Sequence, residues 1–193
     1  MYKVFFKRFI DVLLSGMGMI ILSPVYLLCL LLIPLESKGP IFFNQVRLGK
    51  NGKTFLLFKF RTMYDTERKT RGEVLLNNNE VTKIGYFLRR FKIDELPQLI
   101  NIFIGDMSIV GPRPALPAQI NEFNEDGKYR ILVKPGLTGL AQINGNIYLT
   151  WENRWKYDRY YVQNMGFILD IKIILKTILI VILGENKFIN NVN

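Results

Sequence analysis

The longest apolar segment of the chain lies near its N-terminus, where no charged residue occurs from Val12 to Leu35. A straight helix of that length would reach about 36 Å, enough to cross a hydrocarbon core about 30 Å thick. A secretory signal peptide is the alternative, but its apolar part covers only about 7–15 residues, and no small-residue cleavage pattern follows this run. The pattern therefore predicts a membrane-embedded helical segment over residues 1–36.

The middle of this run contains Ser23-Pro24. A proline inside a helix removes one backbone hydrogen bond and clashes with the preceding turn, which costs about 3 kcal/mol or more. Basic residues flank the run on both sides: Lys3, Lys7 and Arg8 before it, and Lys38, Arg47, Lys50 and Lys53 after it. Positive flanks favour the cytoplasmic side of a membrane. A helix that enters, bends and leaves by the same face satisfies both flanks, while an ordinary kinked span is equally compatible with the proline.

Beyond Leu35 the pattern changes to that of a domain with a polar surface. Two short β-branched and aromatic runs, 41–43 and 54–58, enclose a glycine-containing turn and predict a small β-hairpin. Apolar spacing and capping signals predict helices over 81–91, 94–104, 118–123 and 151–164. Polar residues over 65–79 and prolines over 105–117 predict loops. The predicted fold class is α+β and mainly helical.

The last apolar stretch, residues 167–183, carries Asp170, Lys172 and Lys176. These charges disfavour a membrane span, whereas two lysines one turn apart suit an amphipathic helix at the membrane interface. Tryptophans and tyrosines between residues 151 and 161 are of the kind that gathers at membrane surfaces. The chain is thus expected to divide into a membrane segment over 1–36, a membrane-seated domain over 37–185 and a tail over 186–193.

The charge of the chain narrows the classes of partner. Its 193 residues include 26 lysines and arginines against 16 aspartates and glutamates, a formal net charge of +10. Such a balance favours nucleic acid, anionic lipid headgroups or a phosphorylated substrate. The chain has no histidine, which excludes Ser-His-Asp and Cys-His nucleophile systems and His-ligated zinc. Its one cysteine, Cys29, excludes an intrachain disulfide and is expected to be a small buried hydrophobe.

The first candidate for chemistry is Asp94-Glu95-Leu96-Pro97. A proline fits only the first turn of a helix, so we expect Asp94 at or next to the helix N-cap. The helix dipole there favours an ionised carboxylate, and an ionised carboxylate can attack phosphorus. Asp94 and Glu95 can share one site only if the backbone departs from helical geometry at that point. The alternative is plain capping by Asp94 beside a solvated Glu95.

Several basic residues are candidates for binding phosphate. Arg113 lies between two prolines, which restrict the backbone and so the direction of its guanidinium, whose donor fork matches phosphate oxygens. The alternative for this residue is an ion pair in a structural loop, for example with Asp106. Lys59 and Arg61 alternate at the end of the predicted hairpin and would share one strand face. The alternative for these two is a solvated strand end.

A carboxylate on the predicted helix 151–164 is the last candidate. Asp158 could help to hold a divalent cation or orient a basic side chain. An ion pair with Arg154 or Arg159 on the same helix is the alternative. No single one of these motifs identifies a function.

Taken in order along the chain, the motifs resemble those of a known family. They are Lys7-Arg8-Phe9-Ile10-Asp11, Ser23-Pro24, Gln45-Val46-Arg47-Leu48-Gly49, Lys59-Phe60-Arg61-Thr62-Met63, Leu88-Arg89-Arg90, Asp94-Glu95-Leu96-Pro97-Gln98-Leu99, Gly105-Asp106-Met107-Ser108, Gly111-Pro112-Arg113-Pro114 and Lys134-Pro135-Gly136-Leu137-Thr138-Gly139. This string resembles the bacterial sugar transferase family in its small single-domain form, the monotopic phosphoglycosyl transferases. The resemblance runs from about Lys7 to Thr177, and the stretch from Asp94 to Pro114 is its most specific part.

The resemblance implies an activity and roles for the candidate residues. Family members transfer a sugar 1-phosphate from a UDP-sugar to polyprenol (undecaprenyl) phosphate and release UMP, as a first membrane step of glycan assembly. Asp94 would be the nucleophile of a covalent intermediate, with Glu95 as its dyad partner and Mg²⁺ beside Asp94. Arg113 would hold phosphate, and Lys59 and Asp158 would support the dyad and the metal.

The resemblance also implies a location and partners. The family sits on the cytoplasmic face of the bacterial inner membrane, anchored by a re-entrant helix that turns at Ser23-Pro24. An N-acetylated sugar is expected, hexoses remain open, and downstream glycosyltransferases are possible partners, but nucleic acid is not. Two rival hypotheses stay open: a non-catalytic basic membrane-anchored module that binds lipid or nucleic acid, and direct attack by the polyprenol phosphate without a covalent step.

Overall fold

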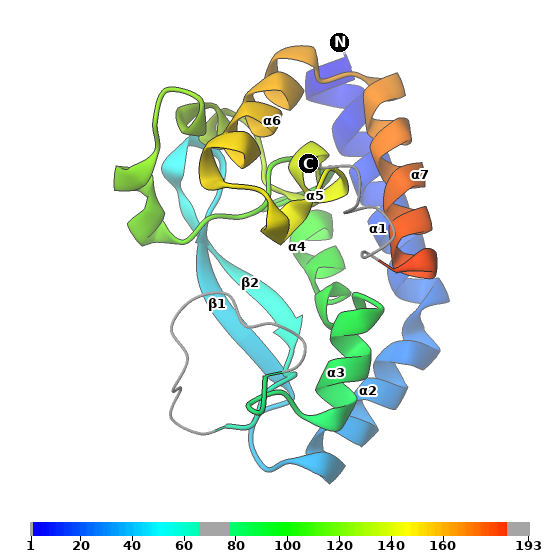
Figure 1. The fold of residues 1–193 in the computed structure, drawn as a ribbon. Coiled ribbons are helices and arrows are strands. Elements are labelled where there is room, and N and C mark those ends of the chain that lie inside the picture. The colour runs from blue at the N-terminus through cyan, green and yellow to red at the C-terminus, as the bar shows by residue number, and fades with distance from the viewer. Residues whose placement is uncertain (1, 66–77, 185–193) are drawn as a thin grey trace.

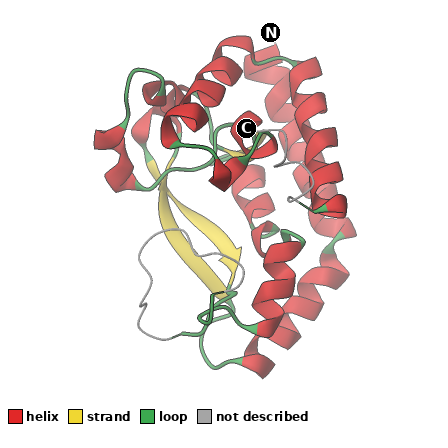
Figure 2. Ribbon diagram, in the orientation of Figure 1, coloured by secondary structure: helices red, strands yellow, loops and turns green. Residues whose placement is uncertain are grey.

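The computed structural model describes residues 2–65 and 78–184. Helices dominate the fold, and the strands form two small sheets (Figures 1 and 2). The helices are a π-helical turn Tyr2–Phe6, α1 (Lys7–Ile21), α2 (Ser23–Glu36), α3 (Lys83–Arg90), α4 (Gln98–Ile104), α5 (Leu140–Ile143), α6 (Trp151–Asn164) and α7 (Phe167–Leu183). The strands are β1 (Phe42–Leu48), β2 (Thr54–Phe60), β3 (Ser108–Val110) and β4 (Gly136–Thr138). Short 3-10 segments are Lys50–Gly52, Ile93–Glu95, Pro117–Glu122, Gly127–Leu132 and Asn146–Tyr148.

The N-terminal apolar run folds into two helices rather than one. Helices α1 and α2 are bent by 59° relative to each other, and Leu22 separates them. Pro24 lies in the first turn of α2, where a residue without an N–H is tolerated. The predicted break is therefore present, one residue before Ser23. None of the described helices is by itself both long and apolar enough to cross a membrane, whereas α1 and α2 taken together are.

The helix pair packs against the rest of the chain along its length (Figure 1). Helix α1 contacts α4, and α2 contacts α3. A buried cluster joins Cys29 and Ile33 of α2 to Phe60 of β2 and Leu88 of α3. Cys29 is only 3% exposed, which confirms the prediction of a buried hydrophobe. The helix pair is thus part of the core, and its packing sets the position of the hairpin.

The predicted β-hairpin is confirmed and is longer than expected. Strands β1 and β2 pair antiparallel over seven residues each, from Phe42 opposite Phe60 to Leu48 opposite Thr54. Asn51 and Gly52 in the turn have φ values of 58° and 73°, the left-handed conformation that asparagine and glycine tolerate best. The hairpin therefore carries Lys59 at the strand end that lies farthest from the turn.

A second sheet was not predicted. Strand β3 lies in the segment 105–117 that the prolines marked as a loop, and it pairs in parallel with β4. Gly111 and Gly136 explain the close approach, because a Cβ added at Gly136 would lie 2.1 Å from the backbone nitrogen of Gly111. Three-residue strands show no alternation in sequence, so their pairing depends on contacts between distant segments.

The predicted helices are confirmed over 81–91, 151–164 and 167–183 and differ elsewhere. The helix expected over 94–104 is divided into the 3-10 turn Ile93–Glu95 and a helix that begins only at Gln98. The helix expected over 118–123 is the 3-10 segment Pro117–Glu122. Most of the predicted loop 65–79, and the tail 186–193, lie outside the described residues.

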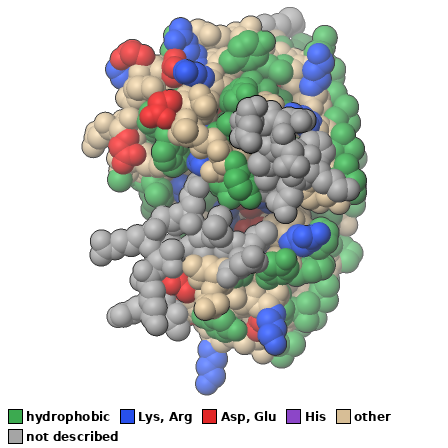
Figure 3. Space-filling model, viewed as in Figure 1, with side chains coloured by type: hydrophobic (Ala, Val, Ile, Leu, Met, Phe, Trp, Pro, Cys, Tyr) green, Lys and Arg blue, Asp and Glu red, His purple; other side chains and the backbone are tan. Residues whose placement is uncertain are grey.

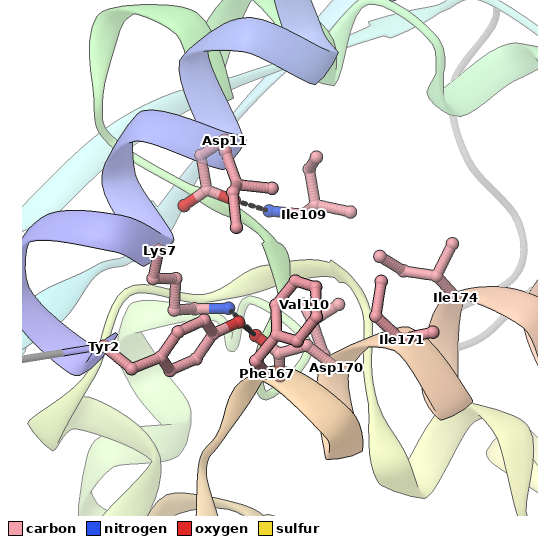
Figure 4. Close-up of a pocket in the computed structure, with 10 residues that line it drawn as sticks. Tyr2, Lys7, Asp11, Ile109, Val110, Phe167, Asp170, Ile171 and Ile174 are labelled. Carbon is pink, nitrogen blue, oxygen red and sulfur yellow. Dashed lines mark hydrogen bonds and ion pairs between the residues drawn. The ribbon is translucent and has the colours of Figure 1, made fainter.

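Residues of the Lys7-to-Asp11 motif tie α1 to distant segments. Lys7 Nζ donates to Asp170 Oδ2 of α7 at 2.6 Å, and the Tyr2 hydroxyl donates to the same oxygen at 2.5 Å (Figure 4). Asp11 Oδ1 accepts from the backbone N–H of Ile109 in β3 at 2.9 Å (Figure 4). This motif therefore has a structural task, which is to fasten α1 to α7 and to the second sheet.

Arg8 of the same motif caps the C-terminal end of α4. Its guanidinium donates to the carbonyls of Ile102 and Phe103 at 2.6 and 2.8 Å. These carbonyls belong to the last turn of α4, where acceptors have no partner within the helix. A cation at a helix C-terminus also interacts favourably with the helix dipole.

Apolar side chains cover much of the surface formed by α1, α2 and α7, which lie along one side of the molecule (Figures 1 and 3). In a water-soluble chain this amount of exposed apolar surface marks an interaction site. The most exposed members are Phe9, Ile20, Ile21, Leu27, Leu31, Leu35, Ile168, Leu175 and Ile182.

Candidate functional site

Three of the predicted site residues meet around one carboxylate oxygen. Glu95 Oε1 accepts from Lys59 Nζ at 2.6 Å and from an Arg113 guanidinium nitrogen at 2.9 Å. Lys59 comes from strand β2, Glu95 from the 3-10 turn before α4, and Arg113 from the loop after β3. Three segments that are far apart in sequence therefore converge on Glu95, and the interpretation of Glu95 as a solvated residue is wrong.

Burial of Glu95 opposes its ionisation, but the neighbouring cations prevail. Arg113 contributes most among them, followed by Lys59 and Lys92, and together they hold the pKa of Glu95 well below its usual value. The side chain is only 10% exposed, so these interactions are weakly screened by solvent. Glu95 is a fixed anion of the site.

Asp94 lies beside Glu95 and is equally buried, at 8% exposure. It is not at the N-cap of a helix, as predicted, but inside a 3-10 turn that starts after Lys92, a residue in the left-handed conformation with φ of 56°. Burial raises the pKa of the Asp94 carboxyl; Lys59 opposes this shift, and the charge of Glu95 adds to it. Asp94 and Glu95 were expected to share a site only if the backbone departed from α-helical geometry. The 3-10 turn Ile93–Glu95 provides this departure.

The side chain of Asp94 differs from that of Glu95 in its contacts. Among the described residues, no hydrogen bond or ion pair reaches the carboxyl of Asp94, while Glu95 accepts two. The dyad thus consists of one carboxylate held in place by two cations and one, called open from here on, that no described residue holds in a hydrogen bond or ion pair.

A small pocket borders this cluster. Its lining comprises Arg47, Leu57, Lys59, Glu95, Gln98, Arg113 and Pro114. Three of these side chains are cationic and one is anionic, so the lining carries a net positive charge suited to a phosphate or diphosphate. Leu57 and Pro114 form apolar parts of the wall.

Arg61 is not brought to this pocket. Its guanidinium donates to the backbone carbonyls of Ser37 and Lys38, just after α2, with the Ser37 bond at 2.7 Å. The side chain is buried, at 6% exposure for the residue. Arg61 thus holds the end of α2 against β2, and none of its contacts with described residues supports the phosphate-binding role expected for it.

Asp158 does not reach the dyad directly either. Its Oδ2 lies 3.0 Å from Arg130 Nε, and both side chains are buried. Arg130 in turn donates to the carbonyl of Arg113 at 2.8 Å. Arg159, one of the expected helix partners of Asp158, pairs with Asp126 instead. Asp158 therefore supports the site through Arg130 and the backbone of the loop that carries Arg113.

Three residues of the site have no role in the sequence-based prediction: Arg47, Gln98 and Arg130. Arg47 and Gln98 belong to motifs that carry the family resemblance, so their place in those motifs was the available signal. Arg47 donates to the carbonyl of Pro114 at 3.1 Å and so connects β1 to the Arg113 loop. Arg130 lies in no motif, and only its contacts in the folded chain identify it.

The acidic groups present are compatible with a magnesium ion held partly by substrate. The described residues contain no cluster of three or more acidic, cysteine or histidine side chains suited to a metal. Mg²⁺, however, is commonly held by one or two carboxylates together with substrate phosphates and water. The carboxyl of Asp94, which no described residue holds in a hydrogen bond or ion pair, fits that arrangement, whereas the Oε1 atom of Glu95 is occupied by two cations.

Sequence comparisons place these features in a family. The family model for bacterial sugar transferases matches residues 2–184. The chain is 42% identical over 179 residues to an uncharacterized sugar transferase, EpsL, of Bacillus subtilis, covering 93% of this chain and 88% of that protein.

Two further relatives are much longer than the matched region. The chain is 40% identical to the UDP-glucose:undecaprenyl-phosphate glucose-1-phosphate transferase of Escherichia coli, over 89% of this chain and 39% of that protein. It is 36% identical to the UDP-N-acetylgalactosamine-undecaprenyl-phosphate N-acetylgalactosaminephosphotransferase of Aeromonas hydrophila, over 93% of this chain and 44% of that protein. The chain described here is therefore an enzyme that belongs to the bacterial sugar transferase family.

Proposed function

We propose that this protein transfers a sugar 1-phosphate from a UDP-sugar to polyprenol phosphate, with release of UMP. The observation that carries the proposal is the pairing of an open buried carboxylate, Asp94, with a fixed one, Glu95, beside a cationic pocket. The named activities of the Escherichia coli and Aeromonas relatives, which transfer sugar phosphates to undecaprenyl phosphate, support the same class of acceptor.

Asp94 is the proposed nucleophile. A carboxylate oxygen attacks the phosphorus that bears the sugar, and the bond from that phosphorus to the bridging oxygen breaks, so that UMP leaves with the electron pair. An oxygen of polyprenol phosphate then attacks the same phosphorus and displaces the aspartate. The open side chain of Asp94 supports this role, because a nucleophile held in hydrogen bonds would have to break them first.

The cations of the site counter the repulsion between a carboxylate and a diphosphate. Arg113 is 42% exposed at its side chain, so it can contact an incoming phosphate while it stays paired with Glu95. Lys59 is more buried and fixes Glu95 from the other side. Electrostatic stabilisation of this kind commonly makes the largest contribution to catalysis.

Mg²⁺ is the proposed metal, held by Asp94 and by substrate oxygens. When bound, it would neutralise the charge that develops on the phosphoryl oxygens. Glu95, with Oε1 engaged by Lys59 and Arg113, keeps the two cations in position and does not need to coordinate the metal.

The protein is proposed to act at the cytoplasmic face of the bacterial inner membrane. The bend between α1 and α2 supports a re-entrant anchor that turns next to Ser23-Pro24, and basic residues flank both ends of it. Exposed apolar side chains on α7 support a seat for the domain at the lipid surface. The domain would then meet the phosphate of a lipid acceptor at the level of the lipid headgroups.

The donor sugar and the later partners are open to a direct screen. The sugars named for the two relatives differ, one being glucose and the other N-acetylgalactosamine. An N-acetylated sugar is our proposal for this chain, and downstream glycosyltransferases would take its lipid-linked product. Release of UMP from a panel of UDP-sugars, measured on the protein in detergent or nanodiscs, identifies the preferred donor.

Replacement of Asp94 tests the mechanism. Asp94→Asn should abolish UMP release and prevent trapping of a radiolabelled phosphosugar on the protein in the absence of acceptor, while membrane attachment persists. Asp126→Asn, in an exposed ion pair away from the pocket, is the matched control and should retain activity. Turnover without any trapped label would favour direct attack by polyprenol phosphate. A wild-type protein that binds membranes but releases no UMP from any donor would favour a non-catalytic module.

A further inference from the structure

Gln98 is a buried polar residue that lines the same pocket as Lys59, Glu95 and Arg113. It is the first residue of α4 and lies one turn after Glu95 in the chain. Only 3% of the residue is exposed. Among the described residues no hydrogen bond reaches its side-chain amide, and the residue lines the cationic pocket.

Asn101, on the next turn of the same helix, shows the usual behaviour of a buried amide. Its nitrogen donates to the carbonyl of Leu56 at 2.8 Å, and its oxygen accepts from the N–H of Phe58 at 3.1 Å. Buried side-chain amides are nearly always satisfied in this way, because leaving one without a partner costs about 1–3 kcal/mol. Asn101 therefore fastens α4 to β2, whereas no described residue holds the amide of Gln98 in this way.

We infer that the amide of Gln98 is a substrate contact that donates a hydrogen bond to the diphosphate of the nucleotide donor. The other polar side chains of the pocket are Arg47, Lys59, Arg113 and Glu95, with three cations against one anion. A pocket of that charge collects anionic oxygens, and an amide N–H facing them donates. The inference rests on the proposed function, since it assumes that a UDP-linked donor enters this pocket.

An uncharged hydrogen-bond donor such as the Gln98 amide can orient phosphate without adding to the positive charge of the pocket. Lys59 and Arg113 each hold Glu95, so every additional charge near them would change the balance that keeps Glu95 ionised. An amide contributes direction to phosphate binding without altering the net charge. Gln98 is thus suited to orienting the diphosphate while Lys59 and Arg113 supply the attraction.

Two substitutions of Gln98, with UDP and uridine as probes, test the inference on the full-length protein. Gln98→Met keeps the length of the side chain and removes the donor, and should weaken UDP binding about tenfold. Gln98→Glu keeps the shape and adds a negative charge, and should weaken it further. Uridine, which carries no phosphate, should bind equally to all three proteins. Calorimetric titration in detergent measures both affinities without turnover.

A stability measurement separates ligand contact from a structural role. Because no described residue hydrogen-bonds the amide of Gln98, Gln98→Met should keep or raise the melting temperature of the unliganded protein and should reduce the rise caused by UDP. Asn144→Leu is the matched control: its amide nitrogen donates to the carbonyl of Leu140 and its oxygen accepts from Lys176, both outside the pocket, so this variant should melt earlier but bind UDP normally.

Each remaining outcome has a meaning of its own. If UDP binds both Gln98 variants within twofold of the wild type, or if uridine binding falls as much as UDP binding, the inference is wrong. If the wild type binds UDP with the predicted Gln98 dependence but releases no UMP from any donor, the proposed function fails while the contact stands. If Asp94→Asn alone abolishes turnover and Gln98→Met binds UDP like the wild type, the function stands and the contact does not.

Discussion

Glu95 shows how burial changes the contribution of a single ion pair to stability. Its contact with Lys59 has the same 2.6 Å length as the contact between Glu125 and Lys128. The side chains of Glu125 and Lys128 are 87% and 62% exposed, against 10% and 19% for Glu95 and Lys59. Solvent screens the Glu125–Lys128 pair far more than the Glu95–Lys59 pair, so only the buried pair is expected to contribute to stability and to orient the site.

The substitution Glu95→Gln tests this difference. It leaves the largely buried Lys59 and the half-exposed Arg113 facing a neutral amide, and we expect it to lower the free energy of unfolding by about 1–3 kcal/mol and turnover by about a hundredfold. Chemical denaturation in detergent and a UMP-release assay measure the two effects. Glu125→Gln should leave both unchanged. Equal effects of the two substitutions would contradict the role assigned to burial.

Asp158 offers a second test at the residue scale, through pH. Burial raises the pKa of Asp158 to about 6, against the opposing charges of Arg130 and Arg154. The folded chain then binds more protons than the unfolded chain between about pH 4 and pH 6. The contribution of Asp158 to the free energy of unfolding is therefore greatest below that range and is lost as the pH rises through about 6.

The variant Asp158→Asn lacks this titration and reveals it by difference. Between pH 7 and pH 4 the free energy of unfolding of the wild type, relative to Asp158→Asn, should increase by up to about 3 kcal/mol. Denaturation curves of both proteins at several pH values measure the change. A difference that stays constant with pH would show that Asp158 titrates alike in the folded and unfolded chains.

At the scale of elements, close packing overrides helix propensity in α3. Gly85 lies inside this helix, where alanine would normally stabilise by about 0.5–1 kcal/mol. A Cβ at Gly85 would lie 2.0 Å from the carbonyl oxygen of Thr62, which is backbone and cannot move aside cheaply. The glycine thus allows α3 to contact the segment after β2.

We therefore expect Gly85→Ala to destabilise the protein by about 2 kcal/mol or more, the opposite of its effect in an isolated helix. Gly166→Ala is the control, because a Cβ there meets nothing closer than 3.7 Å and the residue is in extended conformation. Thermal melting of the two variants provides the comparison. A stabilised Gly85→Ala variant would show that the contact between α3 and Thr62 is looser than described.

At the scale of the whole molecule, the bend between α1 and α2 bears on the proposed re-entrant anchor, because it would determine whether the two flanks of the apolar run lie on one side of a membrane. If the two helices were continuous, residues 7–36 would reach about 45 Å and could cross the bilayer. The bend of 59° and the proline at the second position of α2 oppose that arrangement. Both flanks of the anchor are then expected on the same face.

Pro24→Ala should weaken this constraint and place the N-terminus on the opposite face in part of the population. Single cysteines at Lys3 or Lys53, introduced in a Cys29→Ala background, report each flank through labelling with a membrane-impermeant thiol reagent in intact and lysed cells. In the wild-type anchor both positions should be labelled only after lysis. Labelling of one of them in intact cells would indicate a spanning helix.

The sequence alone was sufficient to predict several elements of the fold and four residues of the candidate site. The charge-free run with its central proline, the hairpin and the helices over 151–164 and 167–183 follow from local periodicity and turn chemistry, and the structure confirms them. Asp94, Glu95, Lys59 and Arg113 were identified from local motifs and the family resemblance, because each motif restricts the backbone near its own residue.

Tertiary packing decided the rest, because it depends on segments that local patterns cannot relate. The parallel pairing of β3 with β4, the diversion of Arg61 to the end of α2 and the chain of contacts from Asp158 through Arg130 to Arg113 all join residues far apart in sequence. The same holds for the place of Gln98 in the cationic pocket, since the neighbours of a buried amide are known only when the chain is folded. Periodicity reports which face of an element is buried, but only the folded chain determines what that face meets.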